Sequence, residues 1–461
     1  MQETKDIIKW QEQLSSSELD REFLMPILRK MPDAELGEIF QGLRNEDLLE
    51  VLSRFTNERQ GLIFDELDMS RRLDFFQHVS KKRFTVIFEN MPSDSRADMF
   101  QHLTQQEQAE LIPYLTKKTR EDVLNLSAYP PETAGGIMST DFATITEELT
   151  CEEAINKVRK DAPSKKMVYH IYVVNHDMKL LGFVTLKDII LAEPHQKVSS
   201  IIHREYIFSH VNEDRERVAV KIEKYDLVAI PVINDRDQLL GIVLQEDAIE
   251  IIRAEHTEDL EKFMGIVPGK EILNYSQTTV WGHFKKRVVW LSSLAIIGLI
   301  SGIIIHHYEE AMSALIILAL YMPMVADTGG NTGSQAATVV IRALALGQIS
   351  LRNWASIIFK ETRISLLLAV VLGLIAFGKI LFLSWETDVP EMFSLFYLAT
   401  GISLALSLQV VTATIIGAAL PLVVKRLGGD PAVAASPAIT TVVDITGLLI
   451  YFGIATLFFF S

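Results

Sequence analysis

The chain has 461 residues, 49% of them hydrophobic, and a formal net charge of −15. The acidic excess argues against nucleic acid as a partner and favours cations. The single cysteine, Cys151, excludes an intrachain disulfide and a cluster of thiolate ligands for a metal. Charge is also divided unevenly, because residues 1–280 hold 34 basic and 50 acidic groups whereas residues 281–461 hold 10 and 9. We therefore expect a large acidic soluble part followed by a membrane part.

Residues 1–130 have the apolar spacing of short helices and lack the alternation that is typical of strands. Helix starts are signalled where Pro is followed by Asp or Ser, at residues 32–33 and 92–93. We expect about eight short helices here, packed as an all-α domain. Asp94 and Asp98 lie four residues apart and would share one helical face. A cation that bridges them would stabilise this pair; an ordinary solvated acidic face is the alternative.

An internal repeat follows. Residues 171–190, IYVVNHDMKLLGFVTLKDII, align with residues 230–249, IPVINDRDQLLGIVLQEDAI, at a spacing of 59. Each copy predicts a strand, a turn, a second strand and a helix. The pair resembles tandem CBS domains, regulatory modules that commonly bind nucleotides. Thr185 and Asp188 match the family's ribose contact, whereas the second copy has Leu244 in place of the hydroxyl. The resemblance therefore implies a nucleotide such as ATP at the first copy rather than the second.

A helical stretch, 247–263, follows the second repeat and carries an acidic face. The acids on or beside that face are Asp247, Glu250, Glu255, Glu258, Asp259 and Glu261. An amphipathic piece over 270–284 then leads toward the first apolar segment, which suits a connector lying at a membrane surface. The acidic face fits either a cation sensor or ordinary solubilisation.

Five hydrophobic segments complete the chain, each long enough for a spanning helix. They are residues 288–305, 311–341, 364–385, 392–424 and 431–460. The short loops on one side of these segments hold Lys and Arg, whereas the charged residues of the alternate loops are all acidic. The positive-inside rule then places residues 1–285 in the cytoplasm and the C-terminus outside.

The second segment contains the run PMVADTGGNTGSQ at residues 323–335, rich in helix-breaking and polar residues. We expect these residues to break the helix. Non-helical backbone at membrane depth survives only where it is buried in protein or lines a wet cavity, so the break should lie in such a place. Freed carbonyls, together with Asn331, Thr332 and Gln335, would then offer oxygen ligands.

The last segment contains a lone carboxylate, Asp444, with Arg426 as the nearest preceding basic residue. A charged acid at bilayer depth costs roughly 2.5–3.5 kcal/mol on insertion scales. Such a residue persists where it faces water, an ion or a partner; a protonated packing residue is the alternative. Asp430 precedes it by 14 residues, roughly 21 Å along a continuous helix. Oxygen donors without thiolate or imidazole favour hard cations.

The order of these parts and the motifs PMVADTGGNTGSQ and GGDPAVAASPAITTVVDITGLLIYF resemble the MgtE family of magnesium channels over essentially the whole chain. The resemblance implies a homodimer whose second and fifth membrane helices line a pore, with Asp444 holding hydrated Mg²⁺. The expected pore residues are Asp444, Asp430, Asn331, Ala432 and Ser436. The positions matching regulatory Mg²⁺ sites are Asp94, Asp98, Gly136, Glu216, Asp226, Asp247, Glu250, Glu255, Glu258 and Asp259, with Asp430 and Asp444 as further metal positions.

We therefore expect a multi-domain membrane protein: a helical N-domain (1–130), an α/β tandem CBS pair (131–252), a linking or plug helix (253–284) and a five-helix transmembrane domain (285–461). The expected function is a Mg²⁺ channel that cytoplasmic Mg²⁺ closes by bridging carboxylates between these parts. The chain lacks a P-loop, which argues against an ATP-hydrolysing pump, and we expect no enzyme activity. An importer of Co²⁺, Ni²⁺ or Mn²⁺ and a membrane-tethered nucleotide sensor are the alternatives.

Overall fold

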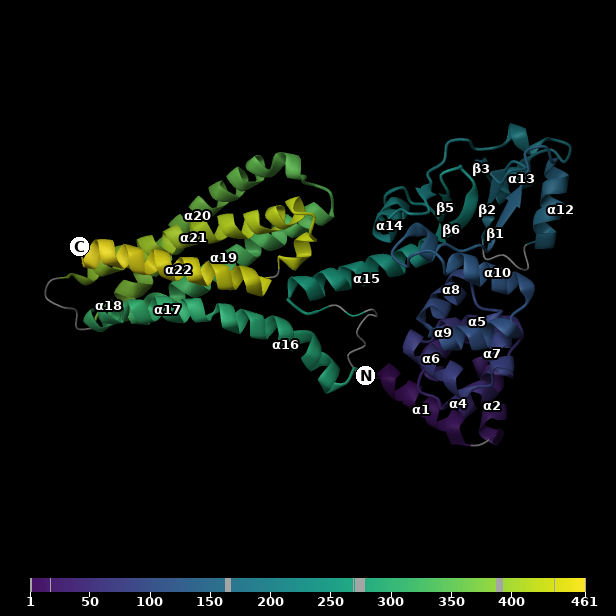
Figure 1. Cartoon of the computed structure of the whole chain (residues 1–461), viewed down its shortest axis with the longest axis horizontal. Coiled ribbons are helices and arrows are strands. Elements are labelled where there is room, and N and C mark those ends of the chain that lie inside the picture. The colour runs from purple at the N-terminus through teal and green to yellow at the C-terminus, as the bar shows by residue number, and fades with distance from the viewer. Residues whose placement is uncertain are drawn as a thin grey trace. The chain divides into compact units, whose positions relative to one another are not determined.

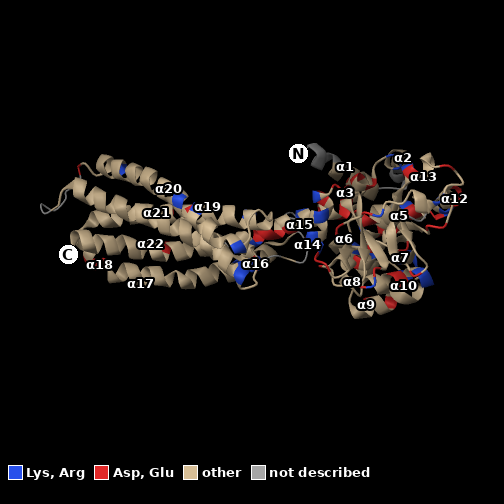
Figure 2. Cartoon of the chain, turned by 90° about the horizontal axis from the view of Figure 1, so that it is seen from above, with Lys and Arg blue, Asp and Glu red and all other residues tan. Residues whose placement is uncertain are grey.

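The computed structural model describes residues 2–16, 18–161, 167–267, 269, 278–386, 393–434 and 436–460 (Figure 1). It divides into two compact units, Met1–Arg253 and Ala254–Ser461. Charged residues are dense over the first unit, whereas the apolar helices of the second, after residue 298, hold fewer of them (Figure 2). The two units are therefore described in turn.

The first unit begins with a helical part, as the sequence predicts. Its helices are α1 (Gln2–Ser16), α2 (Glu18–Leu28), α3 (Asp33–Phe40), α4 (Asn45–Leu52), α5 (Asn57–Asp65), α6 (Met69–His78), α7 (Lys81–Phe88), α8 (Ser93–His102), α9 (Gln105–Leu111), η1 (Ile112–Tyr114) and α10 (Lys117–Leu126). Thr56, Thr104 and Thr116 begin α5, α9 and α10 by accepting a hydrogen bond from the backbone N–H three residues on. The described residues thus contain somewhat more helices than the eight or so expected.

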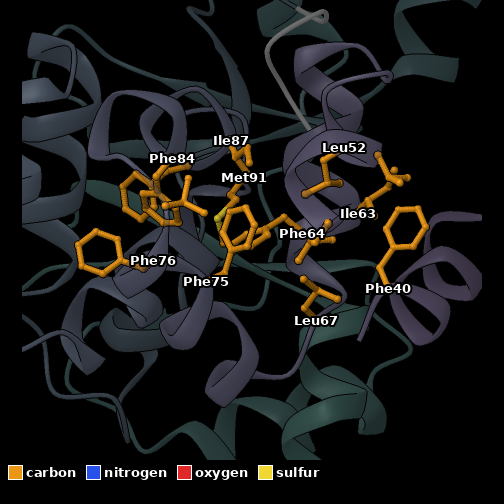
Figure 3. Close-up of a cluster of buried hydrophobic side chains, with 14 of the residues drawn as sticks. Phe40, Leu52, Ile63, Phe64, Leu67, Phe75, Phe76, Phe84, Ile87 and Met91 are labelled. Atoms are coloured by element: carbon orange, nitrogen blue, oxygen red, sulfur yellow. The ribbon is translucent and has the colours of Figure 1, made fainter. Parts of the chain in front are cut away.

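Phenylalanine side chains form much of the core of this helical part (Figure 3). Phe84 is fully buried, and its ring centroid lies 5.9 Å from that of Phe64 and 4.9 Å from that of Phe76, both in edge-on geometry. Edge-to-face pairs of this kind add to the free energy of area burial. Consecutive short helices therefore share one apolar interior.

The CBS-like repeats form two three-stranded sheets. The first contains β1 (Phe142–Ile145), β2 (Met167–Val174) and β3 (Leu180–Thr185), with α12 (Cys151–Asp161) and α13 (Leu186–Leu191). The second contains β4 (Ser209–His210), β5 (Ala229–Ile233) and β6 (Leu239–Leu244), with α14 (Arg215–Lys224). In each sheet the first pair of strands is parallel and the second pair antiparallel.

The two copies share their irregular features at the spacing of 59 residues that the sequence shows. Met178 and Asp237 occupy the same turn position, with φ of 61° and 62° in the left-handed region. The register shift that follows Val173 in the first copy follows Val232 in the second. Equivalent turns and bulges confirm that the copies are one structural unit repeated.

The helical part packs directly on the second repeat. Ala97 and Leu126 belong to the same buried cluster as Val218 and Ile230 of that repeat. Beside this cluster, the buried hydroxyls of Ser93 and Ser139 lie 2.9 Å apart and hydrogen bond. The short helix α11 (Ala134–Ile137) also contributes to the cluster. This shared core joins the helical part and the repeats into one unit.

The long helix α15 (Gln245–Phe263) runs from the second repeat into the second unit, which begins at Ala254. The amphipathic segment expected over 270–284 lies partly outside the described residues, and from Val280 onward it is helix α16. The helices that follow are α16 (Val280–Ile297), α17 (Leu299–His307), α18 (Glu309–Ala314), α19 (Ile316–Ala345), η4 (Leu351–Asn353), α20 (Trp354–Leu383), α21 (Leu395–Arg426), η5 (Pro431–Val433) and α22 (Ser436–Phe459).

Among the described residues, four stretches are long and apolar enough to cross a membrane. They are Val280–His307, Leu351–Leu383, Leu395–Arg426 and Ser436–Phe459. Helix α19 has 30 residues and packs between α21 and α22, but polar residues and glycines interrupt its apolar character. The membrane half therefore has the five long helical segments that the sequence predicts.

The expected break in the second of these segments is wrong. Helix α19 continues through Pro323 and the glycine-rich run to Ala345, so its backbone carbonyls stay within the helix. The glycines serve close packing instead, because a Cβ on Gly417 of α21 would lie 2.1 Å from the carbonyl oxygen of Gly333. Small residues of this kind let membrane helices approach backbone to backbone.

The last segment also differs from a single helix. The short turn η5 follows Asp430, and α22 begins only at Ser436. The estimate of roughly 21 Å between Asp430 and Asp444 assumed continuous helix and therefore does not apply. The side chain of Asp430 begins η5 by accepting a hydrogen bond from the Ala432 N–H at 2.9 Å, which stabilises this turn.

Candidate functional site

A polar stripe runs along one face of α19. Asp327, Asn331 and Gln335 follow each other at intervals of four residues, and all three are exposed. This spacing places them on one side of the helix. From the sequence we expect Asn331 and Gln335 as oxygen ligands, and the structure adds Asp327 to the same face. The spacing of four residues between Asp327 and Asn331 is the sequence feature that indicates a shared helical face.

Asp444 lies beside this stripe. It projects from α22, half-buried, with its Oδ1 atom 3.8 Å from where a Cβ on Gly330 would stand. The carboxylates of Asp444 and Asp327 lie close enough for their charges to interact. Two acids and an amide thus meet on neighbouring helices, a donor set that suits a hard, hydrated cation.

The other predicted pore residues lie at the start of α22. Ser436 donates its hydroxyl to Ser334 Oγ of α19 at 3.1 Å, and Ser334 lies 3.3 Å from Thr440 Oγ1. Ala432 is buried in η5. Within one chain these residues therefore hold α22 against α19.

The linking helix, α15, contacts Asp430 at the start of the turn η5 through Lys262, a residue that the sequence motifs do not single out. Lys262 Nζ donates to Asp430 Oδ2 at 2.8 Å and lies 2.8 Å from Glu258 Oε1. Although partial burial alone would lower it, these two acids hold the pKa of Lys262 well above its ordinary value. The lysine therefore stays positively charged at physiological pH.

Asp259 adjoins the same cluster. Partial burial and then the charge of Asp430 raise the pKa of Asp259, and Glu255 and Glu258 act in the same direction against Lys262. The structure thus brings together three predicted sensor acids of α15 and the predicted pore acid Asp430. Lys262 pairs with two of these carboxylates, and the charges of Glu255 and Asp259 lie nearby, which leaves a local excess of negative charge.

The N-domain acids have a different setting. Asp94 and Asp98 lie half-buried on successive turns of α8, as their spacing predicts. Desolvation raises the pKa of Asp98, and the nearby charge of Asp65 adds to this, whereas His102, Arg72 and Arg215 lower it. His102 Nδ1 lies 3.5 Å from Asp98 Oδ1. Asp98 is therefore set among charges from both the helical part and the second repeat.

The remaining predicted positions in the first unit are dispersed. Glu216 is exposed in the first turn of α14, and Asp226 follows that helix in the left-handed region with φ of 51°. Gly136 lies in α11, where a Cβ would stand 2.2 Å from the Pro130 carbonyl oxygen. Asp247 accepts a hydrogen bond from the Leu244 N–H at 3.2 Å.

Glu250 is exposed on α15. The pKa of Glu66 is raised first by burial, then by the charge of Asp65, and then by the charge of Glu250. This effect places Glu250 near the end of α5 in the helical part. In the described part of a single chain, no group of three or more His, Cys, Asp or Glu side chains is positioned to hold a metal ion. The predicted sensor positions therefore do not form a complete metal site in one chain.

The predicted nucleotide contact forms a helix cap. Thr185 Oγ1 donates to Asp188 Oδ2 at 2.6 Å, and the Asp188 N–H donates back to Thr185 Oγ1 at 3.1 Å. His203 Nε2 also contacts Asp188 Oδ2, at 2.9 Å, and its ring stacks on Phe183. Partial burial tends to raise the pKa of Asp188, but these hydrogen bonds hold it below its ordinary value. In the second copy Leu244 provides the N–H of the cap but no hydroxyl.

Comparisons with known proteins cover all three parts of the chain. The family model described as divalent cation transporter matches residues 322–454, the MgtE intracellular N domain matches 31–132, and the CBS domain matches 134–195 and 198–254. The magnesium transporter MgtE of Thermus thermophilus is 35% identical over 343 residues, 74% of each chain. That of Bacillus subtilis is 36% identical over 337 residues, 73% of this chain and 72% of the relative.

A solved structure is also similar. The crystal structure of the soluble part of a magnesium transporter is 25% identical and covers 55% of this chain and 99% of its own, with a TM-score of 0.50. This similarity agrees with the architecture of the first unit, a helical part followed by two CBS-like repeats.

Proposed function

The chain belongs to the MgtE family of divalent cation transporters, and from this premise we propose that it is a homodimeric, Mg²⁺-selective channel for magnesium uptake. The curated relatives are named as magnesium transporters, which are not enzymes. In the described part of the chain, four stretches other than α19 are long and apolar enough to cross a membrane, which supports a membrane protein. The proposal concerns how its residues conduct and regulate the ion.

One observation carries the proposal: the exposed polar stripe of α19 lies beside Asp444. Acids and amides facing lipid at bilayer depth are costly, so they face water or another protein surface. A second copy placed against this stripe would enclose a polar path between the two chains. Asp444, Asn331 and the Asp327 carboxylate would then attract Mg²⁺ with its water shell, because Mg²⁺ sheds its waters reluctantly.

In this proposal, the cytoplasmic end of the path is formed by Asp430 and Ala432 at the turn η5 and by Ser436 at the start of α22. The surplus of basic residues in the loops on their side supports a cytoplasmic N-terminus and an external C-terminus in the cell membrane. A cysteine placed at Asn353 should therefore resist impermeant thiol reagents applied to intact cells, and one at Trp385 should react with them. The reverse pattern would overturn this orientation.

We further propose that cytoplasmic Mg²⁺ closes the channel. The acids of α15, the N-domain and the repeats repel one another when Mg²⁺ is scarce, and bridging Mg²⁺ would draw them together. Closure requires that Mg²⁺ bind the closed state more tightly than the open one. The cluster around Lys262 supports this proposal, because Glu258 of α15 and Asp430 before α22 both pair with this lysine, and Asp259 feels the charge of Asp430.

ATP is proposed as a ligand of the first repeat alone. The Thr185 hydroxyl and Asp188 carboxylate lie at one helix start beside the ring of His203. The second repeat lacks the hydroxyl. Equilibrium dialysis with ATP should therefore show binding that Thr185→Val weakens and Leu244→Ala does not; equal effects would contradict the assignment.

The transport proposal is tested with purified full-length protein in liposomes. Asp444→Ala should remove most Mg²⁺ uptake while the protein stays folded and dimeric, because the carboxylate attracts the ion and does not form the core. Leu449→Ala, a change at an exposed apolar residue of the same helix, serves as the matched control. Wild-type uptake by Asp444→Ala would reject the proposal. Parallel uptake of Co²⁺, Ni²⁺ and Mn²⁺ separates the Mg²⁺ channel from the alternative importer.

A further inference from the structure

A buried amide lies directly behind the proposed pore acid. Gln409 of α21 has 0% of its surface exposed, and its Nε2 atom donates to the Val443 carbonyl oxygen at 2.8 Å. Val443 immediately precedes Asp444 on α22. A carbonyl oxygen only accepts hydrogen bonds, so the amide nitrogen must be the atom that faces it. The contact therefore joins α21 to the turn of α22 that carries Asp444.

The two other helices that meet here, α19 and α22, each have a glycine next to this amide. A Cβ on Gly329 of α19 would lie 2.4 Å from Gln409 Nε2, and a Cβ on Gly447 of α22 would lie 2.6 Å from the same atom. Neither position therefore accepts a larger residue without displacing the amide. On the other side, Thr412 Oγ1 lies 3.3 Å from Gln409 Oε1, but it lies closer to the Leu408 carbonyl oxygen, at 2.9 Å. The bond from Nε2 to the Val443 carbonyl oxygen therefore lies in a buried setting, where leaving the amide unpaired is costly.

We propose that Gln409 is a positioning residue that sets the rotation of α22 and thereby the place of the Asp444 carboxylate beside α19. The inference rests on the proposed role of Asp444 in conduction. Val443 points into the contact among α19, α21 and α22, and Asp444, one residue further along the helix, projects about 100° away. Any rotation of α22 allowed by loss of the amide contact would therefore swing Asp444 relative to Gly330 and Asp327.

Supporting groups that orient an ion-binding side chain typically contribute about 10-fold to 100-fold in affinity or activity. Gln409→Met keeps the volume of the side chain but removes the donor. We expect this variant to raise the Mg²⁺ concentration for half-maximal uptake about tenfold. Gly447→Ala should act in the same direction, because its methyl group displaces the same amide. Thr414→Val is the control: this buried hydroxyl of α21 bonds only its own helix, at Val410 O.

A second measurement tests position without relying on transport. Asp444→Cys is made in a Cys151→Ala chain and modified with a small water-soluble thiol reagent, with and without Gln409→Met. We expect Gln409→Met to change the modification rate about tenfold and Thr414→Val to leave it unchanged.

A modification rate of Asp444→Cys that Gln409→Met leaves unchanged, or wild-type half-saturation in Gln409→Met, would overturn the positioning role. If instead Asp444→Ala transports normally while the modification rate still changes, the conduction proposal fails and the positioning contact stands. If Gln409→Met does not fold, the modification rate of Asp444→Cys is instead compared with and without Gly447→Ala.

Discussion

The ammonium group of Lys262 lies 2.8 Å from Asp430 Oδ2, although the two residues are 168 positions apart in the chain. One belongs to the linking helix and the other to the start of the last membrane segment. Because Lys262 also pairs with Glu258, a single positive charge occupies the place where a cation would bridge these parts. Within the chain, the Lys262 ammonium group thus takes the position that a bridging Mg²⁺ would take in the proposal.

Removing the positive charge of Lys262 should weaken the contact between the linking helix and Asp430 when Mg²⁺ is absent. The three side chains keep between 23% and 37% of their surface exposed, so solvent screening limits the pair to about 1 kcal/mol. We therefore expect Lys262→Met to speed protease cleavage after Phe263 about fivefold in a chelator. Added Mg²⁺ should restore protection, because the freed carboxylates then bind it. Lys117→Met, which removes an exposed i,i+4 pair with Glu121, should change neither rate; equal protection of Lys262→Met and wild type would contradict the role.

Neutralising the acidic face of α15 should prevent closure. The variant changes Asp247 and Glu250, Glu255 and Glu258 to their amides. We expect it to keep conducting at Mg²⁺ concentrations that close the wild type, because bridging ions lose their ligands while Asp444 is unchanged. Channel activity at stepped cytoplasmic Mg²⁺ provides the measurement.

The matched control for that variant removes the same charge from four exposed acids elsewhere, Glu121, Glu152, Glu193 and Asp235. This control should close as the wild type does. If both variants close at the wild-type Mg²⁺ concentration, the acids of α15 only solubilise the chain.

Acidification should partly replace Mg²⁺ at the linking helix. Burial and the charge of Asp430 raise the pKa of Asp259, so the arrangement in which α15 lies beside Asp430 binds a proton more tightly than a separated one. By linkage, this arrangement is destabilised at neutral pH and gains stability as the pH falls toward the ordinary aspartate range near about 4.

Protease protection of the linking helix in a chelator should therefore increase between pH 7 and pH 5 (about three units and about one unit above the ordinary aspartate pKa). Asp259→Asn should be protected already at neutral pH and show a flatter profile. Glu153→Gln is the control, because hydrogen bonds from Thr150 lower the pKa of that exposed acid. A profile of Asp259→Asn that matches the wild type would assign the pH dependence to another group.

The helical part should depend on its phenylalanine core. Phe84→Ala removes a fully buried ring that contacts two others, at an expected cost of about 3–5 kcal/mol. Hydrogen exchange in α6 to α8 of the full-length protein should rise accordingly. Phe23→Ala, at a side chain that is 79% exposed, should stay within about 0.5 kcal/mol of the wild type. Unchanged exchange in Phe84→Ala would mean that the neighbouring rings fill the cavity.

Some features of this protein depend only on local order in the chain, and the sequence by itself determined them. The CBS-like repeat is one, because strand, turn and strand recur within 20 residues and return at a spacing of 59. Asp444 is another: an isolated acid in an apolar segment has an unfavourable insertion energy wherever the helix packs.

Other features depended on contacts between distant segments, and only the tertiary structure decided them. Glycine and proline in residues 323–335 predicted a break, but packing against α21 at Gly333 and Gly417 keeps α19 helical. Nothing near Lys262 in sequence indicates Asp430 as its partner, and nothing near Gln409 indicates Val443. The energy of such pairs comes from burial and hydrogen bonding across helices, and that depends on which surfaces meet in space.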